Sequence, residues 1–83
     1  MEKILCDLKK GQSAKVLYLN CDVHLKRRLL ELGILKNEVI KILSVSPLKN
    51  SYLIAIKNYS LALRKNILQN IIVEIIWIIL LHL

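Results

Sequence analysis

The residues best spaced for chemistry are Cys21 and His24, which stand three positions apart near the start of a predicted helix. A thiolate and an imidazole at this spacing are ligands that zinc uses, and the same pair has the groups of a nucleophile and its base. The other ligand candidates, Cys6 and His82, stand at opposite ends of the chain. Zinc sites draw on closely spaced pairs, and the sequence offers only one. We therefore expect no cofactor, and keep Cys21 and His24 as the weak candidates for zinc or ferrous iron.

Catalysis is disfavoured by the size of the chain and by its few glycines. A domain of 83 residues buries only roughly 60% of its unfolded surface, which leaves little room for an internal active site. Its two glycines, Gly11 and Gly33, form neither a phosphate-binding loop nor an oxyanion loop. The sequence therefore predicts a protein that is not an enzyme and binds no nucleotide.

The net charge of +7 is the strongest indication of a partner. It comes from 13 basic and 6 acidic side chains and favours contact with phosphates, anionic lipids or an acidic protein face. Most basic residues are scattered singly, but Lys26, Arg27 and Arg28 are adjacent. The cluster is either a solvated helix face or a docking patch, and for docking we favour Lys26 and Arg27.

The N-terminus has no signal-peptide pattern, so we expect a cytoplasmic chain with reduced cysteines.

Short segments must position these residues. Residues 14–19 have the β-branched and aromatic character of a strand. A helix should begin after Asp22 as its N-cap and end at Gly33. The buried face of that helix is predicted from an i, i+4, i+7 spacing of Leu25, Leu29 and Leu32. The remaining predicted elements are strands at 39–45, 51–57, 60–63 and 71–74 and a helical turn at 65–70.

The order of these segments resembles the FeoA family. The resemblance is carried by Arg28-Leu29, Leu32-Gly33-Ile34, the turn Ser46-Pro47-Leu48, and Leu61-Ala62-Leu63-Arg64 followed by Ile72-Val73. Asn37 and Asn58 stand where the family usually has glycine. Asparagine is the non-glycine residue that best tolerates a positive φ, so we expect both turns to form.

The resemblance implies a mainly β (α+β) domain over residues 1–74. Its fold would be a small SH3-like β-barrel of about five strands, with one short helix inserted after the first strand. It further implies a non-enzymatic regulatory adaptor of ferrous iron uptake, which docks by protein contact on FeoB, a GTPase-linked membrane permease. The chain would lie at the inner face of the cell membrane when bound to that transporter, and would touch the membrane only through it.

Two other functions fit parts of the pattern. A basic SH3-like barrel could bind nucleic acid, but the four aromatic residues do not form an interleaved stacking platform. The chain could also be a fragment resembling the C-terminal domain of an iron-dependent repressor. Salt-sensitive binding to DNA or RNA would distinguish the nucleic-acid function from the adaptor.

Residues 75–83 form an apolar C-terminal extension that the resemblance does not explain. The extension is shorter than the roughly 20 apolar residues that a membrane-spanning helix needs. A final strand, a short packed helix and a contact to the membrane or to FeoB all fit its composition. We favour a homo-oligomer formed through residues 75–83, with Trp77 as a contact residue, because pairing removes exposed apolar surface from water.

Overall fold

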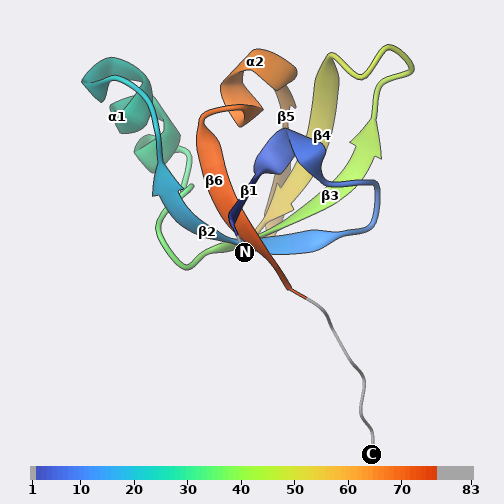
Figure 1. Cartoon of the computed structure of the whole chain (residues 1–83), viewed down its shortest axis with the longest axis horizontal. Helices are drawn as coiled ribbons and strands as arrows, with labels where there is room; N and C mark the ends of the chain where they lie inside the picture. The colour runs from blue at the N-terminus through green and yellow to red at the C-terminus, as the bar shows by residue number, and fades with distance from the viewer. Residues whose placement is uncertain (1, 77–83) are drawn as a thin grey trace, which may run out of the picture.

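The computed structural model describes residues 2–76. Over this range the chain is mainly β, with a sheet of six strands, two helices and one 3-10 turn (Figure 1). The elements follow one another as β1 (Glu2–Ile4), η1 (Leu5–Asp7), β2 (Ser13–Leu19), α1 (Val23–Glu31), β3 (Val39–Val45), β4 (Ser51–Ile56), β5 (Tyr59–Arg64), α2 (Lys65–Leu68) and β6 (Ile71–Ile76).

The six strands pair in the order β1-β6-β2-β3-β4-β5, and every pair is antiparallel. Bulges between Val16 and Tyr18 in β2 and between Ile42 and Ser44 in β3 help to curve the sheet. Within the described range no pairing joins the edge strands β1 and β5. The predicted mainly β domain with a short helix is confirmed, whereas the closed barrel of about five strands is corrected: the sheet has six strands, is curved and stays open.

The strand that the sequence analysis missed is β1, and its place explains part of this difference. Its three residues pair with the far end of the chain, with Glu2 opposite Glu74 and Ile4 opposite Ile72. Because β1 comes first, α1 follows the second strand and not the first. A strand of three exposed residues has no alternation of buried and exposed positions from which a sequence could predict it.

The core lies between the sheet, η1, α1 and α2. Ile34, Ile42 and Ile54 are fully buried, as are the residues that seat the helices, Leu29 in α1 and Leu68 in α2. No polar or charged side chain of residues 2–76 is buried. The interior is therefore apolar, and the candidate chemistry of this domain lies on its surface.

The two turns with asparagine differ in detail. Asn37 has a φ of 75°, as expected for a residue that takes the place of a glycine. In the hairpin between β4 and β5 the positive φ, 54°, falls on Lys57 and not on Asn58. A two-residue hairpin turn needs a positive φ at its first position in both favoured types, which accounts for Lys57.

The last strand extends into the predicted C-terminal extension. Ile75 pairs with Ala14 and Ile76 with Ser13, so these two residues belong to the sheet. The rest of the extension, including Trp77, lies outside the described residues. No helix among residues 2–76 is long and apolar enough to cross a membrane.

Candidate functional site

The predicted cysteine and histidine lie at the start of α1. Cys21 is half-buried just before the helix, and His24 is exposed in its first turn. Cys6 is half-buried in η1, and its carbonyl oxygen accepts a hydrogen bond from the Tyr52 hydroxyl. Among residues 2–76 no three His, Cys, Asp or Glu side chains are grouped to hold a metal ion, and His82 falls outside this range.

The surroundings of both thiols favour the neutral form over the thiolate. Partial burial raises the pKa of Cys21 above its usual 9.0, Asp22 adds to the rise, and Lys26 opposes it. Burial and Asp7 likewise raise the pKa of Cys6, against the effect of Lys65. The thiolate is the form that attacks an electrophile or binds a metal, so these environments disfavour both kinds of chemistry.

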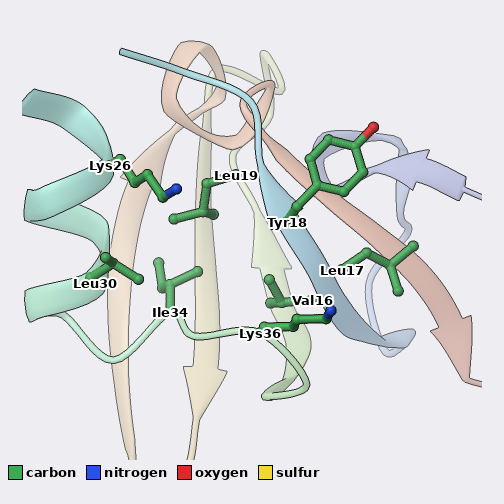
Figure 2. A pocket seen from close by; sticks show the side chains of 8 residues that line it. All are labelled: Val16, Leu17, Tyr18, Leu19, Lys26, Leu30, Ile34 and Lys36. Carbon is green, nitrogen blue, oxygen red and sulfur yellow. The ribbon is translucent and has the colours of Figure 1, made fainter. Parts of the chain in front are cut away.

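The predicted docking residue Lys26 lies at a hollow between α1 and β2, which we call the α1–β2 groove. Its volume is about 200 Å³, and the residues that line it are Val16, Leu17, Tyr18, Leu19, Lys26, Leu30, Ile34 and Lys36. Figure 2 shows Leu19, Leu30 and Ile34 in the space between helix and strand, while Tyr18 points away from the helix. The groove therefore has apolar walls. It also has two lysines, Lys26 from α1 and Lys36 from the segment that follows α1.

The groove exists because β2 parts from β3 halfway along its length. Ser13, Ala14 and Lys15 pair with β3, and Val16 makes two further backbone hydrogen bonds, to Glu38 and from Asn37. Beyond Val16 the paired neighbour of β2 in the described structure is β6 alone. The chain turns out of the sheet into α1, which packs back over the gap.

Helix α1 is fixed at both ends, as the sequence predicted. The Asp22 carboxylate accepts the Leu25 N–H at 2.8 Å. At the other end Gly33, which follows the C-cap Leu32, has a φ of 94° and turns the chain out of the helix. The Ile34 N–H then donates to the carbonyl of Leu29, and the buried Ile34 side chain holds the helix end against the core. These caps set the direction of the helix face that carries Lys26 and Leu30.

The sequence points to Lys26 as a binding residue by its charge, but it does not point to the apolar residues of the groove. Leu30 in particular does not belong to the predicted buried face of Leu25, Leu29 and Leu32. Leu30 is 40% exposed and lies one turn from Lys26 on the same face. A leucine on a basic helix face was the available signal. Arg27 is exposed on α1 but does not line the groove, and Trp77 is not described.

A sequence model of the FeoA domain matches residues 4–75, which is most of the chain. The chain belongs to the FeoA family. FeoA domains are small and non-catalytic, and membership relates this chain to iron uptake. No curated protein sequence matches it.

Solved structures support the family and the fold. The iron(II) transport protein A of Clostridium thermocellum is 30% identical with a TM-score of 0.84, covering 89% of this chain and 46% of that protein. The FeoA protein of Chlorobium tepidum is 28% identical with a TM-score of 0.83, covering 90% of this chain and 71% of that one. The FeoA-like protein of Clostridium acetobutylicum is 24% identical with a TM-score of 0.85, covering 92% and 88% of the two chains.

The same fold occurs in a different kind of protein. A manganese-dependent transcriptional repressor is 18% identical to this FeoA chain with a TM-score of 0.83, and the match covers 90% of this chain but 41% of the repressor. At this identity the likeness shows the fold alone. It agrees with the SH3-like fold expected from the sequence, and it gives this chain neither manganese nor DNA as a ligand.

Proposed function

We propose that this FeoA chain is a non-enzymatic regulatory adaptor of ferrous iron uptake, which docks on a FeoB-type transporter at the cytoplasmic face of the membrane. The single observation that carries the proposal is the α1–β2 groove, an apolar hollow flanked by lysines on a small domain of an iron-uptake family. The proposal assigns no resident cofactor to the chain, since ferrous iron is the cargo of the transporter.

The groove suits a short apolar segment that also carries an acidic side chain. Val16 and Ile34 are fully buried and form its floor, and Leu30 is exposed enough to gain from being covered. Lys26 and Lys36 form no ion pair among the described residues, so both charges are available to a carboxylate of the partner. Charge would guide the encounter, while the apolar contact would supply most of the affinity.

The partner segment can also bind through its backbone. Because no described strand pairs with β2 on the helix side beyond Val16, an extended segment can be added there. Strand addition gains affinity from main-chain hydrogen bonds and specificity from pockets for alternate side chains. In this arrangement the groove would take one apolar side chain of the added strand.

The test is binding of the full chain to the purified cytosolic region of FeoB from the same cell, with and without GTP and at two salt concentrations. We expect Leu30→Asp and Lys26→Glu to weaken binding at least tenfold, the glutamate variant mainly at low salt. Leu48→Asp and Lys49→Glu are the matched controls, since they make the same changes at exposed residues outside the groove. The proposal would be contradicted if the control variants lost as much affinity as the groove variants. It would also be contradicted if none of the four substitutions changed the affinity.

We further propose that FeoA chains of this kind associate through residues 75–83. Ile75 is half-buried and packs on the core, and both it and Ile76 are paired in β6. A variant that ends at Ile76 therefore keeps every described strand. We expect it to be smaller than the full chain by sedimentation equilibrium while its circular dichroism is unchanged. An equal mass for the two chains would contradict self-association.

A further inference from the structure

The most exposed large apolar side chain of residues 2–76 is Leu48, at the tip of the turn between β3 and β4. It is 83% exposed, compared with 61% for Val23, the next in order. Exposure of this extent leaves the side chain with almost no packing inside its own domain. Leu48 therefore contributes little to the fold. A single exposed leucine is common on protein surfaces, so its meaning depends on the side chains that lie beside it.

The turn that carries Leu48 is well fixed. The Ser46 hydroxyl oxygen accepts the N–H groups of Asn50 and Ser51, both at 3.1 Å, and donates to the Asn50 side chain at 2.8 Å. The Lys49 N–H donates to the Ser46 carbonyl at 2.8 Å. The chain between these anchors is short, so Leu48 is held outward from the domain.

Three lysines line a hollow beside this turn. Lys49 lines a hollow of about 350 Å³ together with Lys9 and Lys10 of the loop between η1 and β2, and the only acid among the lining residues is Asp7. The three lysines form no ion pair in the described part of the chain. Three positive charges against one negative charge give this surface a marked attraction for anions. We call Leu48, Lys49, Lys9 and Lys10 the turn face.

The two parts of the turn face are held by the same strand. The Gly11 N–H donates to the Ile42 carbonyl at 2.8 Å, and the Ile42 N–H donates to the Gln12 carbonyl at 2.9 Å. This ties the η1–β2 loop to β3, whose end continues into the Leu48 turn. The turn and the loop lie on the side of the molecule away from α1, so the turn face is separate from the α1–β2 groove (Figure 1).

We propose that the turn face binds directly to the surface of an anionic lipid bilayer, with Leu48 inserted below the headgroups and the three lysines on their phosphates. An apolar side chain that projects beside three lysines matches the order of layers in a membrane, where anionic groups cover a hydrocarbon interior. A fluid bilayer also accepts a projecting leucine without a preformed pocket. The phosphate backbone of a nucleic acid offers that leucine no apolar contact.

The proposal goes beyond docking on FeoB, because it gives this small chain a membrane contact of its own. The contact is weak by construction, since it has one apolar anchor and three charges. Two weak contacts to one membrane assembly strengthen each other when both can form at once. The turn face and the groove share no lining residue, so occupying one leaves the other free.

The test is cosedimentation of the full chain with vesicles of equimolar phosphatidylcholine and phosphatidylglycerol, and with vesicles of phosphatidylcholine alone. We expect binding to the anionic vesicles only. Lys49→Ala and Lys10→Ala should each weaken it about fivefold, the value for one lysine near an anionic surface. Leu48→Ser should weaken it about tenfold through loss of the inserted side chain. These vesicles contain no transporter, so the result is independent of the FeoB proposal.

Matched controls lie on α1. Lys26→Ala removes the same charge and Val23→Ser removes the next most exposed large apolar side chain of residues 2–76, and neither should change vesicle binding. Residues 77–83 are the same in every variant, so any contribution from them cancels. Equal binding to the neutral vesicles would overturn the proposal, as would unchanged binding of the three turn-face variants. Binding to a DNA duplex that falls with Lys49→Ala but not with Leu48→Ser, together with no vesicle binding, would identify a nucleic-acid face instead.

Discussion

The Tyr52 hydroxyl donates a hydrogen bond of 2.9 Å to the Cys6 carbonyl oxygen and so joins β4 to the 3-10 turn η1. Tyr52 is 4% exposed, and its ring is part of the core. The bond lies between residues that are far apart in sequence, and it holds the η1 turn over one end of the sheet.

Tyr52→Phe removes this bond and keeps the ring. We expect it to lower the free energy of unfolding by about 1–2 kcal/mol, because the Cys6 carbonyl loses its partner in a partly buried place. Urea denaturation measures the change. Tyr18→Phe is the control: the Tyr18 hydroxyl donates to Glu2 at 3.1 Å on an exposed surface, and its loss should cost less than half as much.

Stability should fall in alkaline solution. Burial raises the pKa of Cys6 above 9.0 and of Tyr52 above 10.0, so both groups stay neutral in the folded chain at a pH where the unfolded chain loses their protons. Their contribution is complete below the unfolded pKa values and is lost as pH rises through the folded ones. Urea midpoints from about pH 8 to about pH 11 should decline, and the decline above pH 10 should be smaller in Tyr52→Phe. A parallel decline in both proteins would assign the effect to other groups.

The two glycines should differ in their tolerance of alanine. Both have a positive φ, 89° at Gly11 and 94° at Gly33, so each substitution incurs a backbone cost of about 1 kcal/mol. At Gly33 an added Cβ would also come within 3.1 Å of the Tyr59 hydroxyl, whereas at Gly11 it meets nothing within 4 Å. Gly33→Ala should therefore be the more destabilising in urea. Adding Tyr59→Phe should recover part of the difference.

Removing the N-cap of α1 should lower the stability of the domain and also weaken binding at the α1–β2 groove. Asp22→Ala removes the acceptor of the Leu25 N–H and should cost about 1 kcal/mol, while Asp22→Asn should retain most of the cap. Because Lys26 and Leu30 follow on the same helix, the alanine variant should also bind the FeoB cytosolic region less tightly. Unfolding curves and binding isotherms on both variants check this, and unchanged binding by an Asp22→Ala chain that is measurably less stable would contradict it.

A substitution at Lys49 should increase stability and at the same time weaken binding to anionic vesicles. Its φ of 57° is unfavourable for a lysine, so Lys49→Gly should raise the free energy of unfolding by about 0.5 kcal/mol after the entropy cost of glycine. The same variant should lose affinity for anionic vesicles. Lys10→Gly is the control, since Lys10 has no positive φ and the change should not stabilise the fold. A loss of stability in Lys49→Gly would show that the turn does not strain its lysine.

The elements of this fold that depend on local patterns could be predicted. The bounds of helix α1 followed from the Asp22 cap and Gly33, and the left-handed turn at Asn37 followed from the residue type. The predicted buried face was only partly right, since Leu29 is buried, Leu25 is half-buried and Leu32 is 37% exposed. The pairing of the strands could not be predicted, because β1 is too short to show a pattern. Whether the sheet closes into a barrel could not be predicted either, because that depends on how its edge strands pack. The groove combines Leu30 with residues of β2, and only the folded chain brings these together.

The position of β6 has a consequence for synthesis on the ribosome. This strand comes last among the described elements, yet it lies inside the sheet, between β1 and β2. Residue 2 cannot pair until residue 74 has been synthesised. Before β6 is synthesised, residues 13–19 can pair only with β3. Pairings between such distant parts of a chain form slowly. The first third of a growing chain therefore leaves the ribosome with unpaired edges, and we expect it to be a substrate for chaperones until residue 76 has emerged.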